Sequence, residues 1–153
     1  MKIVLDTNVL VAGLLSPFGV CGEIVRMVSS GELILSLDAR ILSEYAEVLH
    51  RPKFKFEEEK VAALLDYIVH RGHITAPSPL RTPLPDSDDE AFLEVAISGQ
   101  AACLITGNKI HFPAKLCRKV KVLTPKEFLL FYKKHKHSKT KIAPMTHKEP
   151  RAR

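Results

Sequence analysis

Three acidic residues that lie far apart in the sequence carry the kind of side chain that binds a divalent cation. Asp6, Glu44 and Asp89 offer carboxylate oxygens, and Mg²⁺ and Mn²⁺ prefer oxygen ligands in proteins. A cation held by such a group activates a bound water molecule for hydrolysis. The residue types therefore predict an acidic, cation-binding cleft, provided that the fold brings the three side chains together.

Short apolar segments alternate with helical patterns along the chain. The apolar periodicity and the Gly and Pro positions predict strands over 2–5, 33–37, 102–105 and 120–123, an extended piece over 73–76, and helices over 9–15, 21–30, 38–51, 57–70, 87–98 and from residue 125. Residues 77–85 contain four prolines and form a loop. This alternation predicts an α/β fold: a single domain with a parallel sheet of about four to five strands, flanked by helices on both faces.

The predicted sheet indicates where a ligand would bind, since ligands of such sheets lie beyond the carboxyl ends of the strands. Asp6, Asp38 and Asn108 all lie just past a predicted strand end. Glu44 falls at the edge of the apolar stripe of its helix. Asp89 precedes the inward-facing positions 92, 93 and 96 by three, four and seven residues, so we expect it to point into the protein. An inward carboxylate is costly unless it is paired or binds a metal.

Each of these residues also has a simpler interpretation. Asp6 can cap the helix that follows it, and Asn8 can satisfy a turn. Asp86 and Asp89 stand at the spacing of a helix N-cap and its third residue, which allows an ordinary capping role for both. Glu44 can be a boundary residue between the buried and exposed sides of its helix. The argument for a site depends on their joint placement at one edge of one sheet.

Positive charge is concentrated at the C-terminal end of the chain. Residues 133–153 contain eight Lys or Arg and one Glu, a net charge of +7, whereas the whole chain carries +6 and residues 1–132 therefore carry −1. We expect a folded domain over 1–132 and a flexible basic tail over 133–153. Such a tail either follows nucleic-acid phosphates without sequence preference or only keeps the protein soluble.

The cysteines and the hydropathy indicate a cytoplasmic protein that does not enter a membrane. The three cysteines are odd in number, form no CxxC pair and lie among apolar neighbours, which favours buried free thiols over a disulfide or a zinc site. No apolar run approaches the ~18 residues of a membrane-spanning helix.

Four blocks of the sequence, in order, resemble the PIN-domain family, which includes VapC-type toxins of toxin–antitoxin pairs. Residues 3–10 (IVLDTNVL) resemble the start of a PIN domain. Residues 42–44 (LSE), 86–89 (DSDD) leading into 92–96 (FLEVA), and 104–108 (LITGN) resemble its later blocks. The resemblance extends over about residues 1–132 and leaves out the basic tail.

The resemblance implies a set of metal ligands. Asp6, Glu44 and Asp89 match the acidic ligands of the family, and Asn8 matches the polar residue that supports the first aspartate. Asn108 stands where the family usually has a fourth acid. An amide oxygen can bind a hard cation but adds no negative charge. Asn108 and Asp86 are therefore further candidate ligands, and the departure leaves open whether one or two ions bind.

The resemblance also implies an activity: hydrolysis of phosphodiester bonds in single-stranded RNA by an Mg²⁺- or Mn²⁺-dependent endoribonuclease, the toxin component of a toxin–antitoxin pair. Ser43 and Thr106 would orient water or phosphate. Lys109 and His111 would contact the scissile phosphate, unless they are solvated loop residues. An antitoxin protein and a second copy of the chain are the partners that the resemblance implies besides RNA.

Three other classes of protein are alternatives to this interpretation of the sequence. A nucleotide-binding α/β module needs a Gly-rich turn after its first strand, and Asp6-Thr7-Asn8 has none. A phosphatase with an aspartate nucleophile would use a second acid at the position of Asn8. A catalytically silent PIN domain that binds RNA or an antitoxin is the strongest alternative, because of Asn108.

Overall fold

The sheet is parallel throughout, and its first strand lies at its centre. The structure, a computed structural model, describes residues 1–142. The five strands have the order β3-β2-β1-β4-β5, with bounds β1 (Lys2–Leu5), β2 (Ile34–Leu37), β3 (His73–Ile74), β4 (Leu104–Ile105) and β5 (Val122–Leu123). All four neighbouring pairs are parallel, so the carboxyl ends of the strands meet at one edge.

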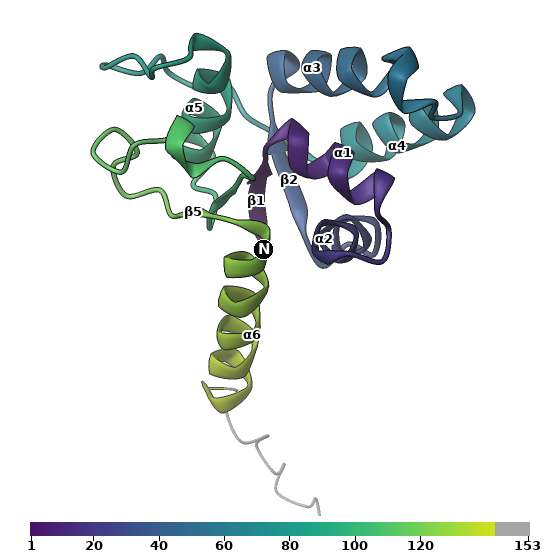
Figure 1. Cartoon of the computed structure of the whole chain (residues 1–153). Helices are drawn as coiled ribbons and strands as arrows, with labels where there is room; N and C mark the ends of the chain where they lie inside the picture. Colours follow the sequence, from purple (N-terminus) through teal and green to yellow (C-terminus); the bar gives the residue numbers. More distant parts are fainter. Residues whose placement is uncertain (143–153) are drawn as a thin grey trace, which may run out of the picture.

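Helices cover both faces of this sheet. They are α1 (Thr7–Leu15), α2 (Val20–Ser29), α3 (Ala39–Leu49), α4 (Glu58–Arg71), α5 (Glu90–Ser98) and α6 (Pro125–Ile142), with single 3-10 turns η1 (Pro52–Phe54), η2 (Ser87–Asp89) and η3 (Lys109–His111). Figure 1 shows α1 to α4 on one side of β1 and β2, and α5 on the other. The predicted α/β architecture, with a sheet of four to five strands between helices, is confirmed.

The core forms around β1, whose residues Ile3, Val4 and Leu5 are fully buried. Val4 lies opposite Leu104 in the register with β4, and Lys2 opposite Ile34 in the register with β2. A strand that is covered on both faces needs apolar side chains on both, which is why it reads as a continuous apolar run. Asp6 ends that run at the carboxyl edge of the sheet.

Side chains cap the starts of two helices. The Asp38 carboxylate accepts a hydrogen bond from the Ile41 backbone N–H at 3.0 Å and so caps α3. Thr124 and Glu127 form a reciprocal capping box at the start of α6, with Thr124 Oγ1 accepting from the Glu127 N–H and Glu127 Oε1 from the Thr124 N–H. These caps fix the residue at which each helix begins.

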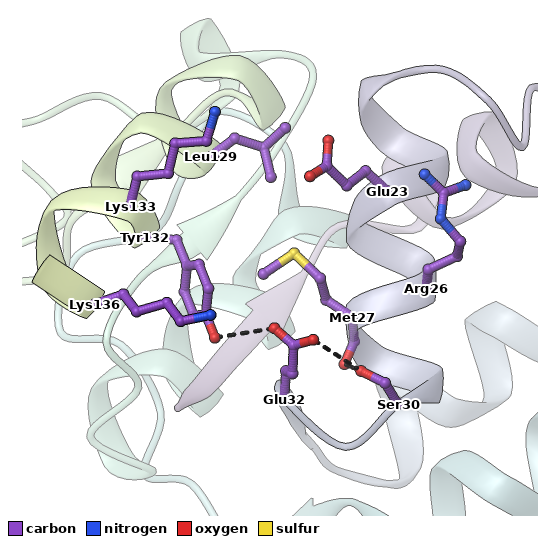
Figure 2. A pocket seen from close by; sticks show the side chains of 9 residues that line it. All are labelled: Glu23, Arg26, Met27, Ser30, Glu32, Leu129, Tyr132, Lys133 and Lys136. Atoms are coloured by element: carbon purple, nitrogen blue, oxygen red, sulfur yellow. Dashed lines mark hydrogen bonds between the residues drawn. The ribbon is translucent and has the colours of Figure 1, made fainter. Parts of the chain in front are cut away.

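α6 continues past residue 132, where the sequence suggests that a flexible tail begins. Its buried anchor is Phe128, whose ring lies 5.9 Å from that of Tyr132. Figure 2 shows α6 beside α2, with the side chains that line the hollow between them. The hollow has a volume of about 450 Å³. At its border the Tyr132 hydroxyl donates to Glu32 Oε2 at 3.1 Å. Residues 133–142 therefore extend a docked helix, and residues 143–153 lie outside the described part of the chain.

Two of the three cysteines are buried, as the sequence predicts, whereas Cys21 is half-buried. Cys21, Cys103 and Cys117 are free thiols, of which Cys103 and Cys117 are buried. Within residues 1–142 no single helix is long and apolar enough to cross a membrane. α1 and α2 would reach that length only together, and the chain bends by 101° between them.

Replacement of the α6 anchor tests how much this helix contributes to stability. We expect Phe128→Ala to lower the free energy of unfolding by about 3–5 kcal/mol, because it leaves a cavity where a fully buried ring stood. Leu130→Ala on the same helix, at a side chain that is 56% exposed, is the control and should change stability by no more than about 0.5 kcal/mol. Urea denaturation measures both, and equal effects would show that α6 is not anchored through Phe128.

Candidate metal-binding cleft

A cleft of about 420 Å³ opens at the carboxyl edge of the sheet. One part of its wall is acidic and the other is largely apolar. The lining residues are Asp6, Thr7, Asn8, Val11, Ala12, Leu15, Glu44, Val48, Arg51, Phe54, Asp89 and His111. The fold thus brings Asp6, Glu44 and Asp89 to one cavity from three separate elements.

Asp6 is held at the end of β1 by contacts with β4. Its backbone N–H donates to the Ile105 carbonyl at 2.9 Å, and its side chain accepts a hydrogen bond from Thr106 Oγ1 at 2.7 Å. Asp6 stands at the N-cap position of α1, but its side chain makes no capping hydrogen bond. The carboxylate is therefore turned toward the cleft and β4, and the simpler capping interpretation does not account for it.

Glu44 reaches the cleft from α3, where its neighbour Tyr45 fixes the helix on the sheet. The buried Tyr45 hydroxyl donates to the Leu5 carbonyl at 2.5 Å. The Thr7 hydroxyl donates to Glu44 Oε2. Glu47, three residues later on the same helix, is exposed and pairs with Arg51.

Asp89 lies where η2 passes into α5, and its side chain is only 13% exposed. Its Oδ2 atom is buried and has no hydrogen-bond partner. The Nδ1 atom of His111 lies 3.1 Å from this oxygen, so the contact has the distance of an ion pair without the angles of a hydrogen bond. A buried carboxylate oxygen without a donor is a costly arrangement in a protein without a bound cation.

The three carboxylates hold protons more tightly than ordinary acids do. Burial raises the pKa of Asp89 to about 6, and the charges of Asp6 and Glu44 add to the rise. Burial likewise raises the pKa of Glu44, with a further contribution from Asp6, against the hydrogen bond from Thr7. Burial also raises the pKa of Asp6, against the hydrogen bond from Thr106. Like charges in a partly buried cleft produce such shifts.

These residues fit a hard divalent cation by their chemistry. All three offer oxygen donors and line the same cleft, and one oxygen of Asp89 has no hydrogen-bond partner. Within residues 1–142, however, no three His, Cys, Asp or Glu side chains lie close enough together to form a ready-made metal site. Two of the carboxylates that would bind the cation now contact other side chains: Glu44 accepts from Thr7, and Asp89 lies beside His111.

Asn108, which occupies the position of the family's fourth acid, is not turned toward the carboxylates. Its amide Nδ2 lies 3.0 Å from His111 Nε2, and its backbone N–H donates to Thr106 Oγ1 at 3.1 Å. Asn108 does not line the cleft, whereas His111 does. Asn108 therefore contacts the cleft only through His111, which lies beside Asp89.

Three other candidates lie outside the cleft. Ser43 is exposed, because one residue along a helix turns the side chain by about 100° away from Glu44. The Lys109 ammonium pairs with Glu127 at 3.1 Å. Asp86 is exposed and its carboxylate caps η2, accepting from the Asp88 N–H at 2.9 Å. Capping thus accounts for Asp86, as the simpler interpretation predicts. Asn8, in contrast, lines the cleft.

The cleft residues that sequence reasoning missed include Thr7, Arg51 and Phe54. Thr7 follows Asp6 directly, but nothing local indicates that its hydroxyl reaches Glu44, 37 residues away. Arg51 lies seven residues, about two helical turns, after Glu44, so the helical period could have placed both on one side. Phe54 belongs to the 3-10 turn after Pro52, whose path no periodicity predicts.

Comparisons with known proteins show the family to which the fold belongs. The PIN domain family matches residues 2–110, which include β1 to β4. An uncharacterized protein of Methanocaldococcus jannaschii is 28% identical over 145 residues, which cover 88% of this chain and 93% of that protein. The crystal structure of VapBC2 from Rickettsia felis bound to a DNA fragment from their promoter contains a chain of similar fold. It has a TM-score of 0.55 and 18% identity, and the match covers 81% of this chain and 98% of that one. The chain belongs to the PIN-domain family.

Proposed function

We propose that this PIN domain is a metal-dependent endoribonuclease that hydrolyses phosphodiester bonds in single-stranded RNA. PIN domains are generally nucleases, which indicates a hydrolase in general. The observation that carries the finer proposal is the convergence of Asp6, Glu44 and Asp89 in one cleft, with the pKa of each raised by burial and of Glu44 and Asp89 also by neighbouring carboxylates. A cleft of this kind gains from a cation that neutralises its charge.

Each residue has a defined part in this proposal. Asp6, Glu44 and Asp89 would hold Mg²⁺ or Mn²⁺, which supplies the activation of water for attack on the phosphate. Thr106 orients Asp6 through its hydrogen bond, and Thr7 orients Glu44. His111 would contact the phosphate after its present contact with Asp89 is broken and the cation takes its place beside Asp89.

The less acidic part of the cleft supports an unpaired RNA strand as the substrate. Val11, Leu15 and Phe54 line it, and the Leu15 side chain is 52% exposed. Unstacked bases of single-stranded RNA bind to apolar and aromatic surfaces of this kind, whereas bases within a duplex are not accessible to them. Arg51 lies beside this surface and is 45% exposed, although it pairs with Glu47.

A toxin role and an antitoxin partner form a further part of the proposal. The VapBC2 structure is that of a complex bound to promoter DNA. In this chain, a groove of about 370 Å³ is lined by Leu14, Val25, Val61 and Leu64, among others, on α1, α2 and α4. Such a groove suits the apolar side of an amphipathic helix. The same region, with Phe18 98% exposed, would serve an antitoxin or a second copy of the chain in the cytoplasm.

A catalytically silent RNA- or antitoxin-binding domain remains the second candidate, and Asn108 is the residue that favours it. The amide adds no negative charge and contacts His111 rather than the cleft. A silent domain would bind RNA without a metal, and this binding would not depend on Asp6. The two candidates therefore differ in one measurable property, metal-dependent cleavage.

Cleavage of labelled single-stranded RNA is the direct test. We expect the purified protein to cut RNA with Mn²⁺ or Mg²⁺ and not with EDTA. Asp6→Asn and Asp89→Asn should each reduce the rate at least about 100-fold, because each removes a charged donor for the cation. Asp66→Asn on the exposed side of α4 is the matched control and should cut at the wild-type rate. Failure of the wild-type protein to cut a broad panel of RNAs in either metal would favour the silent domain.

The raised pKa of Asp89 gives a second test, which needs no substrate. Its pKa of about 6 in the folded protein exceeds the unfolded value of about 3.9, so the folded state binds this proton more tightly. This contribution to the free energy of unfolding is present below about pH 4 and is lost as the pH rises through 6. Asp89→Asn in EDTA should therefore be more stable than wild type by about 1–2 kcal/mol at pH 7.5.

The difference should shrink toward zero at pH 4.5, as measured by urea denaturation at both pH values. Asp66→Asn again serves as the control for a carboxylate on the surface. A difference that is the same at both pH values would show that Asp89 has an ordinary pKa in the folded protein.

A further inference from the structure

Glu94 is a buried charge that the proposed reaction does not use. It lies in α5 within the run 92–96, all of whose residues are buried, and is itself only 7% exposed. Its Oε1 atom pairs with Arg40 Nη1 at 2.8 Å, and its Oε2 atom accepts from the Leu80 N–H at 2.9 Å. The carboxylate therefore connects α5 both to α3 and to the proline-rich loop that leads to Asp89.

Arg40 completes this connection from the start of α3. Its Nη1 binds Glu94, while its Nε and Nη2 both lie 2.8 Å from Asp38 Oδ2. Asp38 in turn caps α3. A planar guanidinium can bind two carboxylates in fixed directions, which the single ammonium of lysine cannot do in the same way.

The pair spans the two elements that supply two of the three cleft carboxylates. Arg40 lies four residues before Glu44, one turn away on the same side of α3. Glu94 lies on the helix that Asp89 leads into. A smaller cavity of about 230 Å³ is lined by residues of α3 and of the segment that contains η2 and the start of α5, among them Arg40, Glu44, Ser87 and Asp88. Glu44 thus has Arg40 and α5 on one side and the cleft on the other.

Stability alone does not explain a charge at position 94. Taking the Glu94 carboxylate out of water is costly, although the Arg40 side chain stays 51% exposed, and well-packed apolar residues in place of a buried charge and its partner are often as stable or more so. What an apolar contact lacks is direction. The ion pair fixes both the distance and the orientation of α5 relative to α3.

We propose that Arg40 and Glu94 are positioning residues that set the placement of Asp89 relative to Glu44, and so the affinity of the cleft for its cation. This inference rests on the proposed cation site. Neighbours that orient metal ligands change metal affinity by about 10–100-fold when they are removed. Loss of the Arg40–Glu94 pair should therefore weaken cation binding without removing any ligand.

The test is Mn²⁺ binding to the full chain, with free Mn²⁺ followed by its electron paramagnetic resonance signal and RNA cleavage measured in parallel. Three variants separate the roles: Glu94→Gln, Arg40→Lys, and the double variant Arg40→Met with Glu94→Leu, which leaves no unpaired charge at position 94. In the double variant Asp38 loses its ion pair with Arg40 and keeps its hydrogen bond from the Ile41 N–H. Glu57→Gln, which breaks the exposed Lys60–Glu57 pair on α4, is the matched control. Circular dichroism and thermal unfolding verify that each variant is folded.

We expect the folded double variant to bind Mn²⁺ at least about 10-fold more weakly than wild type, with the single variants in between and Glu57→Gln unchanged. A folded double variant with wild-type affinity overturns the proposal, whether or not the wild-type protein cuts RNA. If the wild-type protein binds Mn²⁺ but cuts no RNA, while the double variant binds weakly, the positioning role stands and the ribonuclease proposal fails. A wild-type protein that binds no Mn²⁺ overturns both.

Discussion

The cleft is governed by one electrostatic conflict, the burial of three neighbouring carboxylates at the carboxyl edge of a parallel sheet. Asp6, Glu44 and Asp89 reach this edge by separate routes, and their raised pKa values record the cost of burying charge there. Hydrogen bonds from Thr7 and Thr106 reduce that cost, but a neutral hydroxyl does not cancel a charge. A protein that maintains such a conflict gains most from a cation, which is the physical reason for the metal-dependent chemistry that we propose.

Polar contacts between elements hold the three carboxylates close to one another. Tyr45 joins α3 to β1, Thr106 joins β4 to β1, and Arg40 joins α3 to α5. Each contact links two elements that border the cleft. Their net contribution to stability is small beside that of the apolar side chains around β1, since buried polar groups must first lose water. The core supplies the stability, and the polar contacts supply the geometry.

Local patterns predict most of the architecture and the placement of Asp6 and Asp89, because strand ends and helical angles are properties of nearby residues. Local patterns fail where the contact partner of a side chain is distant in sequence, or where the side chain points away from the expected site. Asn108 turns to His111, and Lys109 finds Glu127. Glu94, the charged residue within an otherwise apolar run, was a visible signal, but its partner Arg40 was not. The extent of α6 was also missed, since lysines do not end a helix whose first turns are anchored.

The strand order has a consequence for the order in which this protein assembles during synthesis. β1 is synthesised well before β4, for which one of its two edges is reserved, and the donor to Asp6 is Thr106, 100 residues later. A nascent chain therefore leaves this apolar edge of β1 unpaired until β4 has been made, which makes it a candidate for chaperone binding. The cleft is likewise incomplete until Asp89 and His111 have been made.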